Sequence, residues 1–160
     1  MATVIYGERL YSKWSTLLLG VITAVMLWQV VGQLQTAPPD DLSPWFFPFM
    51  FVLFLALTIN FAWLTILVTD EGVTVGYGVI RTRVPWDEIE DCYRDEASVM
   101  RYGGWGIRYG WYKGNRRLIY NVIGGPRAVL LRRNSRFPEL VFSTSQPQEV
   151  INSLRTYLRR

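Results

Sequence analysis

The sequence predicts a membrane α-helical hairpin followed by a mainly-β domain of about seven antiparallel strands, which a C-terminal helix caps. Three features predict this fold: two long apolar stretches without charge, a change to alternating apolar and polar residues after Thr69, and an apolar face of helical period near the C-terminus. The 160 residues then divide into an N-terminal segment with the hairpin, residues 1–69, and a domain of residues 70–160. The second part is long enough for one small hydrophobic core.

The two uncharged stretches run from residue 14 to 39 and from 42 to 69. Roughly 20 apolar helical residues cross a bilayer, so we expect membrane-spanning helices at about residues 15–34 and 46–68. A cleaved signal peptide is the alternative for the first stretch, but it needs an apolar core of about 7–15 residues and a small-residue cleavage pattern. The first stretch is longer and lacks that pattern. Prolines keep the connection from being helical, at Pro38, Pro39 and Pro44.

The charges predict the orientation of the hairpin. Lys and Arg collect on the cytoplasmic side of membrane segments. Arg9 and Lys13 precede the first expected span, none lies in the connection, and the other fifteen of the seventeen follow Thr69. We therefore expect both termini and the β domain to be cytoplasmic, at the inner (cytoplasmic) membrane of a prokaryote. Tryptophans near the ends of the expected spans suit an aromatic belt, namely Trp14, Trp28, Trp45 and Trp63.

Alternation and turn residues predict the strands of the β domain. They are expected at residues 71–76, 79–85, 86–94, 105–111, 117–122, 128–132 and 140–143. The first two meet at Tyr77-Gly78, a hairpin signal. The expected core comprises Val75, Ile80, Ile89, Ile107, Ile119, Leu130, Val141 and Leu154.

The C-terminal helix is predicted from its start signal and its apolar face. Ser145 and Gln148 have the spacing of a capping box, and Pro147 suits a first turn. An apolar face of helical spacing follows, made by Val150, Ile151, Leu154, Tyr157 and Leu158.

Several kinds of chemistry lack the residues they need. The chain has no histidine and one cysteine, which excludes His-ligated haem and zinc, cysteine clusters and catalytic sets built on histidine. We expect Cys92 to be a half-buried strand residue rather than a nucleophile. No cofactor and no metal are expected. The glycine-rich runs lack the third glycine of a dinucleotide fingerprint and the Lys-Ser/Thr of a phosphate loop.

Acidic residues leave one enzymatic alternative open. Six acids lie between residues 87 and 96, but their spacing is not that of an EF-hand loop. A solvated strand face or an acidic docking patch is the interpretation that we prefer. An enzyme would need a carboxylate pair such as Asp87 and Asp91 lining a pocket.

Four segments resemble a known family: Pro85-Trp-Asp-Glu-Ile-Glu-Asp-Cys92, Tyr102-Gly-Gly-Trp-Gly-Ile-Arg108, Ala128-Val-Leu-Leu-Arg-Arg133 and the closing residues 145–154. They look like bacterial PH-domain membrane proteins, in which a PH-like (pleckstrin-homology-like) domain commonly follows a pair of transmembrane helices. The resemblance implies a PH-like barrel over residues 70–160. Members include, more distantly, assembly factors for membrane complexes, and the family offers no catalytic set to carry over.

Charge is sorted along the β domain. Residues 70–97 hold eight acids and three Arg, whereas residues 98–160 hold twelve Lys and Arg and two acids. A basic surface near the membrane would attract anionic lipid or an acidic partner, at about 1 kcal/mol per basic residue. The candidate residues are Arg101, Arg108, Arg116, Arg117, Arg132 and Arg133. Interleaved aromatics would suit nucleic acid, but membrane tethering restricts access, and we expect no nucleic-acid partner.

Within the expected spans, Asn60 is the polar residue at membrane depth, and Gly20 and Gly32 would permit close packing of helices. A hydrogen bond between helices is a better interpretation of Asn60 than transport, because two helices cannot enclose a pore. We expect a non-catalytic accessory, scaffold or assembly subunit of a larger membrane complex. Its partners would be membrane lipids and other membrane protein subunits. A membrane-tethered module that binds anionic lipid is the first alternative, and an enzyme the second.

Overall fold

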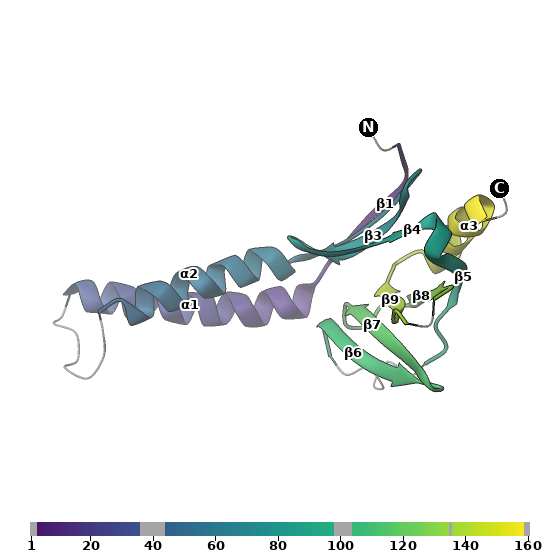
Figure 1. Ribbon diagram of the computed structural model, residues 1–160. Coiled ribbons are helices and arrows are strands. Elements are labelled where there is room, and N and C mark those ends of the chain that lie inside the picture. Colours follow the sequence, from purple (N-terminus) through teal and green to yellow (C-terminus); the bar gives the residue numbers. More distant parts are fainter. Residues whose placement is uncertain (1–2, 36–43, 98–103, 135, 159–160) are drawn as a thin grey trace.

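The computed structural model describes residues 3–35, 44–97, 104–134 and 136–158. It combines a long helical hairpin with a mainly-β body that ends in a C-terminal helix (Figure 1). The two helices project together away from the strands, and the described ends of the chain lie at the opposite side of the molecule. The hairpin and the β body are therefore two distinct parts of the molecule.

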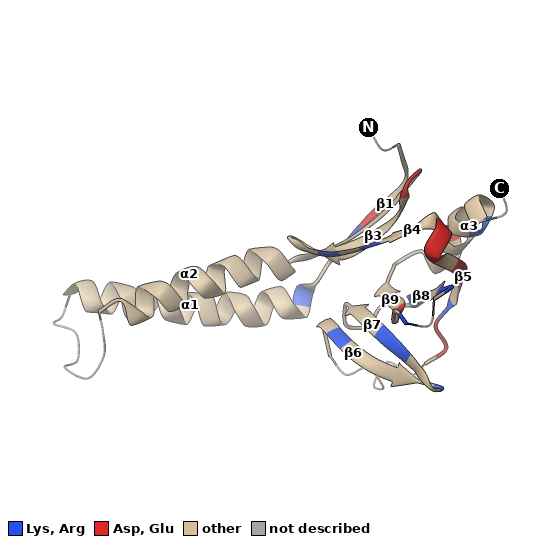
Figure 2. Cartoon of the chain, viewed as in Figure 1, with Lys and Arg blue, Asp and Glu red and all other residues tan. Residues whose placement is uncertain are grey.

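Helices α1 (Lys13–Gln35) and α2 (Phe46–Phe61) form the hairpin. Within the described residues, α1 is the one helix that is long and apolar enough to cross a membrane. Helix α2 is more apolar than α1 but has 16 residues, about 24 Å at 1.5 Å per residue. Figure 2 shows both helices uncharged along their length, with a basic residue only where α1 begins.

A strand occupies the last part of the second expected span. Helix α2 ends at Phe61, and β2 (Trp63–Thr69) follows, so the expected helix over residues 46–68 is too long. The apolar run of β2 alternates, with Leu64, Ile66 and Val68 fully buried on one face. Absence of charge is a property that a membrane helix and a buried strand share, which is why the sequence pattern did not separate them.

Another strand, β1 (Val4–Tyr11), precedes α1 and pairs antiparallel with β2. The helical hairpin is thus inserted between two neighbouring strands, and each strand continues directly into one helix (Figure 1). The expected boundary between residues 69 and 70 therefore falls inside a sheet, between β2 and β3 (Gly72–Tyr77), which pair antiparallel.

The described strands form two sheets. The first sheet has the order β1-β2-β3-β4, with β4 at Ile80–Pro85. The second has the order β5-β8-β9-β7-β6. Its strands are β5 (Ile89–Arg94), β6 (Gly106–Tyr112), β7 (Asn115–Asn121), β8 (Arg127–Arg132) and β9 (Glu139–Ser143). A short 3-10 helix, η1 (Trp86–Glu88), connects the sheets.

The second sheet corrects the expectation that all strands are antiparallel. Strand β9 lies between β8 and β7 and runs parallel to β7, with Leu118 opposite Leu140. Strand β8 supplies the return run that such a parallel pair needs. The seven strands expected after residue 70 correspond to β3–β9, within three residues at each end, and β1 and β2 add to them.

The core lies between the two sheets and under the C-terminal helix α3 (Pro147–Leu158). Helix α3 contributes Val150, Ile151 and Leu154. Most of the expected core residues are buried, but Ile80 is 46% exposed because it flanks the β3–β4 turn. The Ser145 hydroxyl, which we expected at the start of α3 as part of a capping box, donates a hydrogen bond to Glu8 of β1.

Candidate functional site

The helical hairpin presents an extensive apolar surface. Many of its large side chains are solvent-exposed in the isolated molecule, for example Leu17, Val21, Trp28, Phe49 and Ile59. Soluble monomers rarely expose contiguous apolar surface of this extent, and such surface marks a membrane or protein contact. The hairpin is therefore the first candidate for a functional surface.

A pair of threonines forms a polar contact between the two helices. The hydroxyl oxygens of Thr23 and Thr58 lie 3.0 Å apart. Each also lies at hydrogen-bond distance from a carbonyl of its own helix, Leu19 O at 2.8 Å and Phe54 O at 2.7 Å. The two hydroxyl protons can make two of these three contacts as hydrogen bonds at a time. The helices are linked when one threonine donates to its own carbonyl and the other donates to that threonine.

The structure does not show the packing between the two helices that we expected of Gly20, Gly32 and Asn60. A Cβ added at Gly20 or Gly32 would meet nothing within 4 Å, so these glycines do not mark a close approach to α2. The side-chain oxygen of Asn60 accepts a hydrogen bond of 2.9 Å from the backbone N–H of Val79, in the β3–β4 turn. Asn60 therefore joins α2 to the first sheet rather than to α1.

The six candidate arginines do not form one basic face. Arg101 lies outside the described residues. Arg117 is 2% exposed and takes part in a buried ion network, and Arg132 is ion-paired with Glu88. The three that remain exposed are Arg108, Arg116 and Arg133. Arg116 stacks over the Trp111 ring, and Arg133 donates to the backbone oxygen of Ile89.

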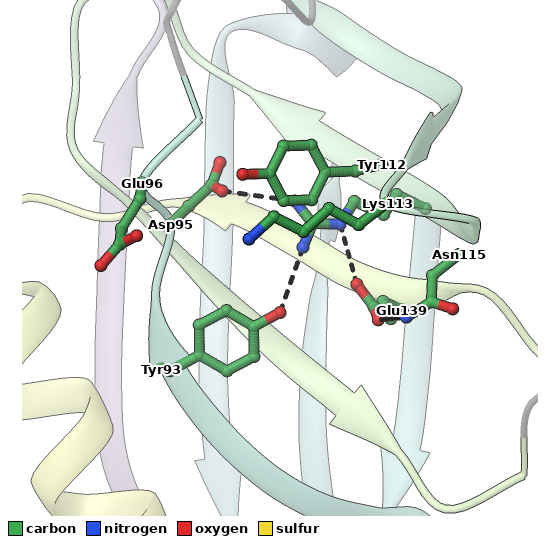
Figure 3. Close-up of a pocket in the computed structure, with 8 residues that line it drawn as sticks. Tyr93, Asp95, Glu96, Tyr112, Lys113, Asn115 and Glu139 are labelled. Carbon is green, nitrogen blue, oxygen red and sulfur yellow. Dashed lines mark hydrogen bonds and ion pairs between the residues drawn. The ribbon is translucent and has the colours of Figure 1, made fainter.

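Arg117 lines a cavity of about 300 Å³, together with Tyr93, Asp95 and Glu139, which Figure 3 labels. Its Nε donates to Glu139 at 2.8 Å and an NH1 donor meets Asp95 at 3.3 Å. Its NH2 donates to the Tyr93 hydroxyl at 3.1 Å, and the guanidinium lies over the Tyr112 ring at 4.2 Å. Register explains the pairing, because Arg117 and Glu139 lie directly opposite on the parallel strands β7 and β9.

Asp95 has a second cationic partner in Arg127, whose Nε donates to it at 3.2 Å. Two buried acids thus face two buried arginines, and the formal charge of the network is zero. Burial raises the pKa of Tyr93 above its ordinary value, and the charge of Glu139 adds to that effect. A tyrosine poised for proton transfer near neutral pH would need the opposite shift. The network is suited to holding the sheet together.

The carboxylates of the enzymatic alternative lie apart from this cavity. Asp91 is ion-paired with Arg155 of α3 at 3.2 Å, and Asp87 belongs to η1. Among the residues that the structure describes, no three acids, histidines or cysteines are grouped as metal ligands would be. Cys92 is fully buried, deeper than the half-buried position we expected, and burial raises the pKa of its thiol to about 12.

A polar junction that the sequence did not indicate surrounds Glu8 of β1. Its carboxylate accepts hydrogen bonds from the hydroxyls of Tyr6, Thr144 and Ser145 and from the Ser145 backbone N–H. Burial by itself raises the pKa of Glu8, but the hydrogen bonds from Ser145 and Thr144 outweigh it and leave the pKa below its ordinary value. The strand before the hairpin is thereby tied to the start of α3.

The geometry gives three candidate features: the apolar hairpin, the buried Arg117 network and the Glu8 junction. A scan against protein-family models finds no matching family, and a search of curated proteins finds no match.

Proposed function

We propose that the protein is a membrane-anchored, non-catalytic accessory, scaffold or assembly subunit of a larger membrane complex. In this proposal both helices of the hairpin cross the bilayer of a prokaryotic inner membrane, and the β body is a cytoplasmic PH-like domain. The observation that carries the proposal is an exposed apolar hairpin that continues directly from two paired strands. Once the hairpin is inserted into the bilayer, it holds the β body at a fixed position relative to the membrane.

The pairing of β1 favours retention of α1 over its removal as a signal sequence. Strand β1 precedes α1, yet it forms a ladder with β2 from Val4 opposite Thr69 to Tyr11 opposite Trp63. Cleavage after α1 would remove an edge strand of the first sheet together with Glu8 and its four hydrogen bonds. A segment that completes the fold is a poor candidate for removal.

The length of α2 is compatible with a second span. A helix of about 24 Å falls short of a hydrocarbon core of about 30 Å. Flanking aromatic residues and local thinning of the bilayer accommodate such a mismatch at modest cost. Trp45 precedes α2 and Trp63 follows it, and both are exposed.

The chemistry of the body supports binding over catalysis. In the cavity around Arg117, the arginine is paired with Asp95 and Glu139, and the thiol of Cys92 is inert at neutral pH. The PH-like assignment rests on the order of strands followed by one amphipathic helix and on the quoted sequence segments. The order of the second sheet, with its parallel pair, is the feature that such an assignment must accommodate.

Replacement of the hairpin tests the proposal. The intact protein, extracted in mild detergent, is expected to migrate with a larger assembly on native gels. A variant in which residues 13–61 are replaced by an unrelated two-helix hairpin should remain in the membrane and lose that assembly. Migration of the intact protein alone, together with substrate turnover by the purified protein, would contradict the proposal.

A second candidate function is binding of anionic lipid by the body. Arg108 and Arg116 favour it, because they are exposed on neighbouring strands β6 and β7 and carry no acidic partner among the described ion pairs. If these arginines bind lipid headgroups, the affinity of the protein for anionic vesicles should decrease as the salt concentration rises. Equal binding to neutral and anionic vesicles would exclude this candidate.

A further inference from the structure

Four residues form a straight row across the first sheet. Arg9 lies opposite Thr65, Thr65 opposite Gly76, and Gly76 opposite Arg81, so the row crosses β1, β2, β3 and β4. Because side chains alternate along a strand, this row faces away from the core that Leu64 and Ile66 help to form. Two arginines therefore flank a short polar residue and a residue without a side chain.

Gly76 allows Arg81 to lie over the middle of the row. A Cβ added at Gly76 would come within 2.8 Å of the Arg81 Cγ and would overlap the backbone oxygen of Ile80. The Arg81 Nε donates to the backbone oxygen of Gly78 at 2.6 Å, which fixes the guanidinium. Among the residues that the structure describes, its terminal nitrogens donate no hydrogen bond, so they remain for another acceptor.

The row borders a cavity of about 190 Å³. Its lining comprises Arg9, Ile59, Asn60, Trp63, Thr65, Gly78 and Arg81. Pockets for whole small molecules are larger, about 300–1,000 Å³, so this one suits a group as small as a phosphate. In the part of the chain that the structure describes, no acid is ion-paired with Arg9 or Arg81, whereas Arg83, one step further out on the same face, is ion-paired with Glu71.

The cavity lies where the hairpin meets the sheet. Tyr11 and Trp63, the strand pair next to the helices, are both exposed, and their ring centroids are 5.7 Å apart. Aromatic pairs of this kind mark the level of lipid headgroups. Val79 is 89% exposed beside α2, where Asn60 holds its backbone. The arginine row lies two strand pairs beyond the aromatic pair, on the same face and further from the helices.

We propose that Arg9 and Arg81 bind the phosphate of an anionic lipid headgroup, with Thr65 at the floor of the site and Val79 against the acyl chains. This deepens the proposed function, since it rests on insertion of the hairpin into the bilayer. Guanidinium groups suit the ligand because they present several donors to phosphate oxygens. The position of the site at headgroup level selects lipid phosphate over free phosphate.

The test uses the full-length protein in detergent and native mass spectrometry with added phosphatidylglycerol or phosphatidylcholine. Wild type should retain phosphatidylglycerol in preference to phosphatidylcholine. Arg9→Gln and Arg81→Gln should each weaken retention about fivefold, and the double variant about 25-fold. Arg83→Gln is the matched control, on the same strand and face, and should retain lipid as wild type does.

Each other outcome has a defined meaning. Equal retention in the double variant and wild type would overturn the lipid site. Displacement of phosphatidylglycerol by millimolar inorganic phosphate would show that the site binds free phosphate rather than the phosphate of a lipid. Carbonate extraction of membranes, done in parallel, checks insertion: release of wild type would contradict the proposed anchoring, whereas retention of a double variant that no longer holds phosphatidylglycerol would support both proposals.

Discussion

Asn60 and Val79 are joined by a hydrogen bond of 2.9 Å, from the Val79 backbone N–H to the Asn60 side-chain oxygen. This contact links the last turn of α2 to the β3–β4 turn. The turn has no room for another residue type at Gly78, because a Cβ there would overlap the Asn60 side-chain oxygen and Gly78 has a φ of +48°. The hairpin and the first sheet are therefore held in one orientation at this point.

Loss of the Asn60 side chain should loosen this junction. Asn60→Ala leaves the Val79 N–H without its acceptor, and a net hydrogen bond contributes about 0.5–1.5 kcal/mol. We expect a lower midpoint of thermal unfolding in detergent for Asn60→Ala. Asn60→Asp keeps an acceptor in place and should lie closer to wild type. Identical midpoints for wild type and Asn60→Ala would show that the contact does not stabilise the fold.

Stability should depend on pH through Glu8. Hydrogen bonds leave its folded-state pKa below the ordinary value of 4.5, so its ionised form stabilises the fold above that pH. The contribution is lost as pH falls below about 4.5 and through the folded-state pKa. Unfolding by denaturant between pH 6 and pH 3 should show this loss in wild type. Glu8→Gln should reduce the pH dependence, and an unchanged slope would be evidence against the Glu8 junction.

Arg117 should matter for stability more than any exposed arginine of the domain. Removing one partner of a buried ion pair costs about 3–5 kcal/mol, because the other charge stays buried. Arg117→Met removes the arginine that donates to Glu139 at 2.8 Å and to Asp95 at 3.3 Å. Arg116→Met, at the neighbouring exposed position, should cost less than about 0.5 kcal/mol. Denaturant unfolding of the two variants compares them, and equal stabilities would contradict a structural role for the network.

The sequence predicted β3–β9 and α3 well because their signals are local. Alternation, glycine turns and a helical apolar face are each readable within a dozen residues. Strand β1 was missed because its partner β2 lies beyond the whole hairpin, with Arg9 opposite Thr65. Such pairing leaves no local signal. The register of the two sheets decided which arginines are buried, and Arg117 looks no different from Arg116 in the sequence.

The candidate site shows the same limit. A basic surface was expected among residues 101–133, from the sorting of charge along the chain. The row of Arg9 and Arg81 joins two residues that are 72 positions apart in the sequence and lie on opposite edges of one sheet. Net charge by segment cannot indicate such a convergence, because neither arginine belongs to a charged cluster.

Cysteine labelling can test the orientation of the protein, provided that Cys92 is removed first. The Cys92 thiol is buried and its pKa is raised to about 12, so it should not react in the folded protein. In a Cys92→Ala background, Glu149→Cys places a thiol at an exposed position of α3. The excess of Lys and Arg after Thr69 predicts that this thiol reacts with a membrane-impermeant maleimide in inverted vesicles and not in intact cells.

Asp40→Cys, in the connection between the helices, is the matched control and should show the opposite pattern. Labelling of Glu149→Cys from outside intact cells would place the β body on the other side of the membrane. Labelling of both positions from one side would contradict a hairpin in which both α1 and α2 cross the membrane.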